Sequence, residues 1–547
     1  MSLTLQFQTH IVENTPSPLA PYDAYATDTP LREALHREGA GWAEAEVAKY
    51  GPVVGGEMVE LGFAANQNRP TLKLFDRYGH RLDEVEFHPA YHRLMELGIA
   101  HGVPSFAWRH ESRSGAHVAR AALAYLHNQP DQGTSCPLTM TYACVPAFRH
   151  QPELAKEWLP RVTSTAYDAR SLPAWDKRGN TIGMGMTEKQ GGSDVRTNTT
   201  RAVHFGEGDL YELVGHKWFF SAPMCDAFLV LAQTEGGQTC FLLPRFAPDG
   251  GRNAIRIQRL KDKLGDWSNA SSEVEFQGAL AWRVGDEGRG LANILEMVAL
   301  TRQDCMIGSA SLMRQALVQA LHHTRHRKAF GKRLSEQPLM RNVLADLALE
   351  SEAAVALTLR VARAIDASTR DPREAAFARI ATAIGKYWIC KRCVPFVNEA
   401  QECLGGIGYV EESGMPRLYR QAPLNSIWEG SGNIQCLDVL RALVREPETR
   451  DALFAELAST KGEHLALDAE VERLTQQLAA VNELETRSRW LVERMALALQ
   501  ASVLVRAGSP VAAIFCETRL GGAHGSAFGT LPALSPFDTL LARAFTP

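Results

Sequence analysis

The sequence has no hydrophobic run long enough to cross a membrane. Its longest apolar runs, such as Ala227 to Ala232, have six residues, whereas a spanning helix needs about 20. The first 18 residues contain neither a basic segment nor an apolar core, so we expect no secretory signal peptide. Both absences predict a cytoplasmic protein without a membrane partner.

No charge of either sign is in large excess. Lys and Arg number 58, Asp and Glu number 62, and the formal net charge is −4. This balance gives no overall attraction to nucleic acid or to an anionic membrane, so any such binding requires a local patch. Internal repeats and low-complexity tracts are also absent. With 547 residues the chain is too long for one core, which predicts three or four folding units.

Cysteine and histidine show no metal-binding pattern. The ten cysteines are scattered, which fits reduced thiols in a cytoplasm. Cys390 and Cys393 have CxxC spacing without a second pair, which favours two small helix residues over a metal or redox pair. His322 and His326 lie one helical turn apart, but no acidic or cysteine partner stands at a diagnostic spacing. The sequence therefore predicts no metal site.

Hydrophobic periodicity divides the chain into four segments. Residues 1–180 predict an extended arm followed by helices, with an amphipathic helix over 31–50 and a buried one over 118–126. In residues 181–285 the pattern changes to short β-prone runs separated by Gly, Asn and Asp, which predicts a compact β domain. These runs are 211–215, 228–232, 240–243 and 272–276.

Helical patterns return in the second half of the chain. Segment 286–445 contains three stretches with the lengths of bundle helices, at 291–324, 335–367 and 372–403. Segment 446–547 predicts an extra helical domain, helical over 449–505, with a Gly/Pro-rich tail after Gly508. No βαβ alternation occurs, and the glycines at 405–408 follow a helix, so a nucleotide site would not be of the Rossmann kind.

Two loops far apart in the sequence contain the residues most suited to binding a cofactor and to catalysis. Residues 186–194, MTEKQGGSD, combine hydroxyls with two glycines that permit close backbone approach to a phosphate. Residues 427–435, IWEGSGNIQ, place the carboxylate of Glu429 between an aromatic ring and a flexible loop, about 240 residues later. An aromatic strand, 217–221, lies between them in the sequence. Together the two loops suggest the halves of one flavin site.

These motifs, with the segments RKAFG at 327–331 and QECLGGIGY at 401–409, resemble the acyl-CoA dehydrogenase family. The resemblance covers residues 180–445. One branch of that family, linked to alkylation stress and DNA binding, is especially similar. The similarity lies in the N-terminal arm, the sequence of residues 183–198 and the extra C-terminal segment. The resemblance implies an N-terminal helical domain, a β-barrel domain and a C-terminal four-helix bundle, here with an extra helical domain. It also implies FAD as cofactor and a homotetramer built as a dimer of dimers.

The resemblance also implies which residues contact FAD. The first loop departs from the family at Lys189-Gln190-Gly191, where Pro-x-Ala is usual, and Glu402 stands where the family has Gln. Segments 327–337 and 402–406 would reach the dinucleotide of a neighbouring subunit. The implied FAD contacts are Met186, Thr187, Gly192, Ser193, Phe219, Phe220, Ser221, Arg327, Phe330, Gln337, Glu402, Gly405, Gly406, Ile427, Trp428, Ser431 and Asn433.

For Glu429 the resemblance implies a catalytic base. It would remove the α-proton of an acyl-CoA thioester while the β-hydride goes to flavin N5. A carboxylate in a dry pocket has a raised pKa and becomes a better base. Its backbone N–H could also donate to the thioester oxygen. The alternative is a loop glutamate without a catalytic role.

DNA binding is the least supported part of this prediction. Residues 446–547 contain nine Lys and Arg against thirteen Asp and Glu, so a duplex would require basic residues gathered on one face. Arg441, Arg487 and Arg519 are the candidates, and solvated helix arginines are the alternative. No helix-turn-helix pattern is visible, so any binding to double-stranded DNA would be independent of sequence.

The leading hypothesis is an FAD protein of the alkylation-stress response. It would dehydrogenate acyl-CoA weakly, with branched short-chain acyl groups as candidates, and bind DNA. The first alternative is a metabolic acyl-CoA dehydrogenase without a DNA role. The second is a flavin-stabilised scaffold whose chemistry is vestigial.

Overall fold

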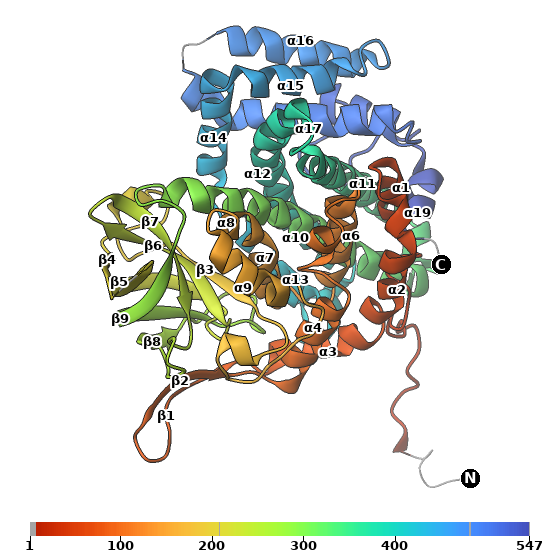
Figure 1. Cartoon of the computed structure of the whole chain (residues 1–547). Coiled ribbons are helices and arrows are strands. Elements are labelled where there is room, and N and C mark those ends of the chain that lie inside the picture. The colour runs from red at the N-terminus through yellow and green to blue at the C-terminus, as the bar shows by residue number, and fades with distance from the viewer. Residues whose placement is uncertain (1–6, 207, 481–482, 546–547) are drawn as a thin grey trace.

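The computed structural model describes residues 7–206, 208–480 and 483–545. A helical N-terminal part, a central β domain and a helical C-terminal half lie against one another (Figure 1). The predicted fold class, mainly α with a central β domain, is confirmed.

The N-terminal part contains an extended arm, nine α-helices and one β-hairpin within the described residues. The predicted helix over 31–50 is wrong as a single helix, because Gly39 has φ +90° and divides it into α1 and α2. The predicted helix over 118–126 is confirmed as α6, which is buried along its whole length. The elements are α1 Thr29–Arg37, α2 Glu44–Val54, α3 Glu57–Gln67, β1 Thr71–Phe75, β2 Arg81–Glu86, α4 Pro89–Ala100, α5 Phe106–Arg109, α6 Ala116–His127, α7 Ser135–Ala143, α8 Val145–Phe148 and α9 Pro152–Val162.

The β domain is a closed barrel. Strands β6, β4, β5, β9 and β7 pair in that order, and β7 pairs back to β6. Strand β3 adds to β6 in parallel, and β8 pairs with β9. The central strands β6 and β7 are buried over most of their length, as continuous apolar runs require. The strands are β3 Ile182–Gly185, β4 Arg201–His204, β5 Leu210–Ser221, β6 Ala227–Thr234, β7 Gly237–Pro244, β8 Ile255–Leu260 and β9 Ser271–Val284.

Four helices form the bundle against which the barrel packs. Proline at the first turn starts both α11 and α12, and the Asp371 side chain caps α12 by accepting from the Arg373 N–H. The three long predicted helices are confirmed within three residues at each end. The helices are α10 Gly290–His326, α11 Pro338–Ala367, α12 Pro372–Glu402 and α14 Gly432–Arg445; β10 Lys328–Ala329, β11 Lys332–Arg333 and α13 Met415–Gln421 connect them.

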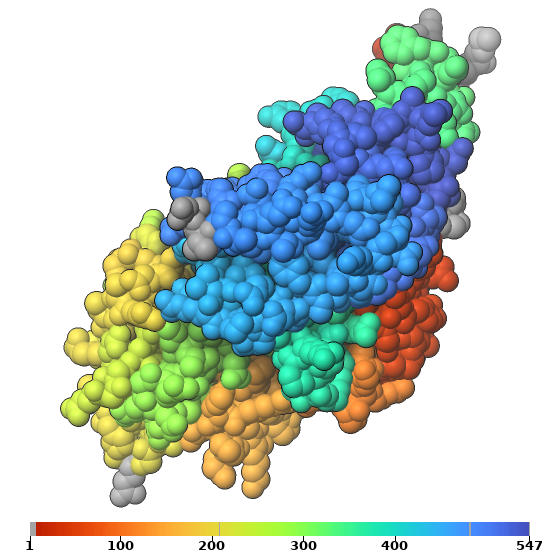
Figure 2. Space-filling view, turned by 90° about the horizontal axis from the view of Figure 1, so that it is seen from above, coloured from red at the N-terminus to blue at the C-terminus, as the bar shows by residue number. Residues whose placement is uncertain are grey.

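The C-terminal segment covers one end of the bundle (Figure 2). Its helices are α15 Pro447–Ala458, α16 Leu465–Ala479, α17 Leu484–Arg506, α18 Ala512–Phe515 and α19 Phe537–Ala544, with a π-helical turn at Cys516–Leu520. The helical prediction over 449–505 holds as three helices instead of one. The tail after Gly508 is not a plain loop, since it contains α18 and α19 and buries Phe515 and Cys516.

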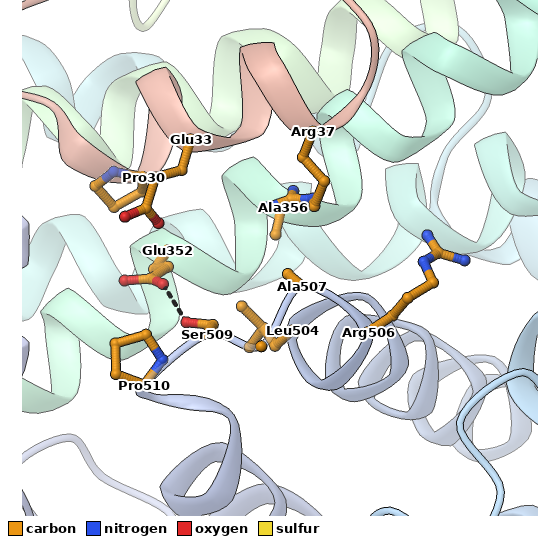
Figure 3. A pocket seen from close by; sticks show the side chains of 11 residues that line it. Pro30, Glu33, Arg37, Glu352, Ala356, Leu504, Arg506, Ala507, Ser509 and Pro510 are labelled. Atoms are coloured by element: carbon orange, nitrogen blue, oxygen red, sulfur yellow. Dashed lines mark hydrogen bonds between the residues drawn. The ribbon is translucent and has the colours of Figure 1, made fainter.

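The tail ties the two ends of the chain to the bundle. Arg543 on α19 donates to Glu33 of α1 and, at 2.8 Å, to Glu352 of α11. The Ser509 hydroxyl donates to Glu352 as well (Figure 3). These contacts border a cavity of about 300 Å³ between α1, α11 and the end of α17. In the described residues no helix is long and apolar enough to cross a membrane.

Candidate active site

The first loop is anchored by a buried ion pair that the motif comparison had not singled out. The Glu188 carboxylate accepts from the Lys217 ammonium at 2.8 Å, and both side chains are fully buried. Glu188 also accepts from the backbone N–H groups of Thr199 and Thr200. The Trp218 N–H donates to the Thr187 carbonyl at 2.8 Å, which joins this loop to β5. Loop 187–193 and the end of β5 therefore form one rigid unit.

The glycines of this loop serve two purposes. A Cβ at Gly192 would lie 2.5 Å from the Thr187 hydroxyl, so that position requires glycine for packing. Gly191 has φ +152° and would meet nothing within 4 Å, so its backbone faces open space. Ser193 is exposed beside it. Open glycine backbone next to a free hydroxyl suits a phosphate group.

The two neighbouring phenylalanines of β5, Phe219 and Phe220, point in opposite directions. Phe219 is 52% exposed, as a residue beside a planar ligand requires. Phe220 is fully buried, and its ring packs against Phe228, Phe276 and Gly185 in the barrel. The Phe220 side chain therefore points into the barrel, because alternate residues of a strand point to opposite faces, and only its backbone is left for the predicted FAD contact.

A hydrogen-bonded relay starts from Ser221. Its hydroxyl lies 3.1 Å from the Ser271 hydroxyl, and the Lys263 ammonium donates to Ser271 at 3.3 Å and to the Asn269 carbonyl at 2.9 Å. Because an ammonium can only donate, Ser271 accepts from Lys263 and uses its own proton toward Ser221. The Ser221 hydroxyl can then donate its own proton to another acceptor.

Glu429 occupies the loop before α14. Its φ of +57° is unusual for a residue with a side chain, so the surrounding contacts must hold it. Its Oε2 lies 2.6 Å from the Thr301 hydroxyl of α10. Burial raises the pKa of this carboxyl, while Thr301, Lys386 and Arg302 oppose the rise. A buried carboxyl with a raised pKa and a single hydroxyl partner is suited to take up a proton.

Backbone contacts fix the Glu429 loop in position. The Arg302 Nε donates to the Glu429 carbonyl at 3.0 Å, and the buried Lys386 ammonium donates to the Gly430 carbonyl at 2.7 Å. The Gln435 amide donates to both carbonyls. Arg302 and Lys386 were not predicted from the sequence, because only the fold brings these two helix residues to the loop. Spacing offers no signal for a contact between positions 302, 386 and 430.

The neighbours of Glu429 lie along the same groove. Trp428 packs against the hydrophobic core that contains the barrel strands, as Met186 does. Ile427 is exposed at 62%. Ser431 is the N-cap of α14. The side-chain oxygen of Asn433 accepts from Arg489 on α17 at 3.2 Å. Loop 187–193 is therefore joined directly to β5, and Met186 and Trp428 share one hydrophobic core.

The remaining predicted flavin contacts lie elsewhere. Phe330 is fully exposed at the tip of hairpin β10–β11, and the Gln337 amide donates to the Ala329 carbonyl. Arg327 donates to the carbonyl of Asn14 in the N-terminal arm. Figure 2 shows this green segment at one end of the molecule, opposite the yellow and yellow-green β domain.

The end of α12 presents a second exposed group. Glu402, Gly405 and Gly406 are exposed, and a Cβ at either glycine would meet nothing within 4 Å. Packing inside the described chain therefore does not require glycine at either position. Gly405 has φ +63°, which by itself favours glycine, so close approach of an outside molecule is the remaining physical reason only for Gly406.

The two groups of predicted contacts are far apart in one chain. Thr301 touches Glu429, and Arg327 follows directly after the same helix, α10, 26 positions later. At a rise of about 1.5 Å per residue this separates them by roughly 39 Å. One FAD molecule cannot bridge that distance, so both groups serve one cofactor only if a second chain supplies one of them.

The predicted DNA contacts do not form a patch. Arg519 is buried and paired with Asp346 and Glu350 of α11, so it is removed from the set. Arg487 is half-buried and donates to the Gln477 side chain at 2.7 Å. Arg441 on α14 is exposed. The prediction fails for Arg519, because that arginine neutralises two carboxylates inside the bundle.

The residues present fit FAD. The groove offers open glycine backbone and a hydroxyl for a pyrophosphate, an exposed aromatic side for a planar ring system and a hydroxyl that Lys263 and Ser271 leave free to donate. Among the described residues, no group of three or more His, Cys, Asp or Glu could hold a metal ion.

Comparison with known proteins agrees with this geometry. Residues 183–279 match the acyl-CoA dehydrogenase middle domain, and residues 288–444 match the acyl-CoA dehydrogenase C-terminal domain. Residues 14–169 match the N-terminal domain of the adaptive response protein AidB. The chain is 50% identical to AidB of Escherichia coli K12, named as an acyl-CoA dehydrogenase, over 94% of this chain and 95% of that protein.

Solved structures show the same fold. ACDH-11 of Caenorhabditis elegans, in complex with C11-CoA, superposes with a TM-score of 0.85 at 25% identity and covers 99% of this chain and 94% of that one. Glutaryl-CoA dehydrogenase of Mycobacterium smegmatis, in complex with FADH2, has a TM-score of 0.54 at 21% identity, over 64% of this chain and 86% of that one, which shows the fold alone. The chain therefore belongs to the acyl-CoA dehydrogenase family of FAD-dependent oxidoreductases, and it carries the AidB-type N-terminal domain.

Proposed function

We propose that the protein oxidises an acyl-CoA thioester to the α,β-unsaturated thioester, with Glu429 as the base. The observation that carries this proposal is the buried Glu429 carboxyl, held by Thr301 in a loop that Arg302 and Lys386 fix. FAD, when bound, supplies a hydride acceptor at N5. The C11-CoA bound to ACDH-11 supports acyl-CoA as the substrate class.

The Thr301 hydroxyl can follow the protonation state of Glu429. This hydroxyl lies 2.6 Å from Glu429 Oε2 and 3.0 Å from the Val298 carbonyl, and its one proton can serve only one of them. While Glu429 is ionised, Thr301 donates to it. Once Glu429 has taken the α-proton, Thr301 can turn its own proton to Val298. The site thus has a hydrogen bond for either state of the base.

Substrate orientation would come from the backbone and from Ser221. The Glu429 N–H has no acceptor in the described part of the chain, so it is available to the thioester oxygen. Thr187, Ser193, Phe219 and Ser221 would hold the flavin side of the groove. We assign Met186, Gly192, Ile427, Trp428, Ser431 and Asn433 to the same groove.

We further propose that a second subunit completes the cofactor site. Arg327, Phe330 and Gln337 would reach the dinucleotide of the neighbour, together with segment 402–406. The separation of about 39 Å along α10 supports this arrangement. A dimer of dimers would contain four such sites.

Anaerobic mixing with acyl-CoA tests the catalytic proposal. The FAD-loaded protein should bleach at the flavin absorbance with acyl-CoAs of different chain lengths and branching. The Glu429→Gln protein should retain FAD and bleach far more slowly. Equal rates for both proteins would contradict the role of Glu429. Rapid, complete bleaching would favour a metabolic enzyme over a weakly active stress protein.

A role in the alkylation response, with DNA binding, is the second proposed function. The match of residues 14–169 to the AidB N-terminal domain supports it. Of the predicted contacts, exposed Arg441 on α14 and half-buried Arg487 on α17 remain. A salt titration with a random-sequence duplex tests it: we expect weak binding that disappears as salt rises. Absence of binding at low salt would contradict it.

A further inference from the structure

A second cavity, of about 240 Å³, is lined by residues of β2, α4 and the β domain. One wall is aromatic and apolar, with Phe87, Tyr91 and Met95. The Phe87 and Tyr91 rings stack with centroids 4.0 Å apart. Arg245, directly after β7, lies on the wall as well. The cavity thus combines an apolar surface with one guanidinium group.

Arg245 is a cation without a matching anion. It is only 9% exposed, and no carboxylate within the described residues lies at ion-pair distance from it. The carboxylates that line or border the cavity already have their own cations. These pairs are Glu84–Arg252 at 2.5 Å, Glu86–Lys73 at 3.3 Å, Asp168–Arg170 at 2.6 Å and Asp226–Lys177 at 2.6 Å. One positive charge is therefore left over.

Hydrogen-bond acceptors are scarce around this charge. Arg245 Nη1 donates to the Ser171 hydroxyl and to the Met224 sulfur, each at 3.3 Å. The same sulfur is the acceptor for the Val85 N–H at 3.3 Å, although a thioether is a weak acceptor. The Arg245 Nε is buried without a partner among the described residues. Since buried charges are normally paired, these donors indicate an anionic ligand.

The shape of the site defines the class of ligand. A volume of about 240 Å³ lies below the roughly 300 Å³ at which pockets for drug-sized ligands begin. One surplus positive charge matches a monoanion, and the stacked rings match an apolar or aromatic body. We propose that this cavity binds a small organic monocarboxylate, with its carboxylate on Arg245 and its apolar body against Phe87 and Tyr91.

Benzoate is a suitable probe, with benzamide as its neutral counterpart of the same shape. Calorimetry on the full-length FAD-loaded protein should show one benzoate per chain, and benzoate should raise the melting temperature in a concentration-dependent way. Benzamide should bind at least ten-fold more weakly. Arg245→Met should lower the affinity for benzoate at least ten-fold. The exposed Arg201→Met on β4 is the matched control and should bind benzoate as the unaltered protein does.

Arg245→Met removes a buried charge without a counter-ion, so we expect it to fold and to melt no lower than the unaltered protein. The melting curve without ligand checks this directly. Unchanged benzoate affinity in Arg245→Met would overturn the proposal, as would equal affinity for benzamide. Displacement of benzoate by equal concentrations of chloride or phosphate would identify an inorganic-anion site and overturn it as well. This test does not depend on the dehydrogenase activity.

Discussion

The two groups of predicted flavin contacts differ in how the chain holds them. Loop 187–193 is fixed by the buried Glu188–Lys217 ion pair, and loop 427–433 by hydrogen bonds from Arg302 and Lys386 to its backbone. Hairpin β10–β11 and segment 402–406 are exposed, and their glycines and Phe330 have open space around them. One chain therefore builds the reacting side of the groove by itself. In the proposed assembly, the exposed hairpin and segment 402–406 would bind the dinucleotide of a neighbouring subunit.

The largest expected effect is on flavin reduction, when Glu429 in loop 427–433 is replaced. Glu429→Gln removes the base but keeps the size and the Thr301 contact, so FAD binding should persist. We expect flavin reduction by acyl-CoA to slow by about 10²- to 10⁴-fold, the usual contribution of a positioned base. Stopped-flow absorbance measures this rate. Thr301→Val should lower the rate of flavin reduction less than Glu429→Gln does. A larger decrease in Thr301→Val would contradict the role of Glu429 as the base.

The buried pair beneath the first loop should dominate stability. Glu188→Gln leaves the Lys217 ammonium buried without a counter-ion, which typically costs about 3–5 kcal/mol. Urea unfolding followed by circular dichroism gives the free energy of unfolding. Glu212→Gln on β5 is the control, since Glu212 is exposed. If both variants unfold at the same urea concentration, the first loop is not held by this pair.

A substitution in the exposed hairpin β10–β11 should change subunit association and leave the fold of the chain intact. Phe330→Ser should leave the melting temperature of the isolated chain nearly unchanged, because the ring has no packing partner in its own chain. It should weaken subunit association and FAD retention together. Light scattering and the flavin-to-protein absorbance ratio measure these effects. Tyr78→Ser, at another exposed turn, is the control. Loss of FAD without dissociation would separate the two roles.

The relay behind Ser221 should have a moderate effect. Lys263→Met removes the ammonium that orients the Ser271 and Ser221 hydroxyls, so the Ser221 donor toward the flavin weakens. We expect the potential of the bound flavin to fall by about 30 mV, which corresponds to roughly 1.4 kcal/mol for two electrons. Spectroelectrochemical titration measures it. An unchanged potential, with FAD still bound, would exclude the relay.

Lowering the pH should gradually remove the stability that the Glu188–Lys217 ion pair contributes. Burial raises the pKa of Glu188, but Lys217 and the hydrogen bonds lower it to about 2, below its ordinary value of 4.5. Its stabilising contribution is therefore complete above pH 4.5 and declines as the pH falls toward 2. The difference in urea midpoint between the unaltered protein and Glu188→Gln should shrink between pH 6 and pH 3. A constant difference would contradict this assignment.

Local periodicity located the long helices and parts of β5, β6, β7 and β9, but it gave no expectation of β3, β4 or β8. It failed where a single residue decides a local shape. Gly39 divides one predicted helix into two, and the short helices α18 and α19 are too brief for a periodic signal. Arg519 shows the same limit for function, since a basic residue in a helix pattern does not reveal whether carboxylates from α11 surround it.

The sequence by itself determined the family, the order of the segments and the loop that carries Glu429. These depend on motifs whose residues are neighbours in the chain. Only the tertiary structure decided that Thr301, Arg302 and Lys386 hold this glutamate, that Phe220 faces the core and that Arg245 is buried without an anion. The physical reason is that burial and charge balance depend on residues from distant segments, which become neighbours only when the chain is folded.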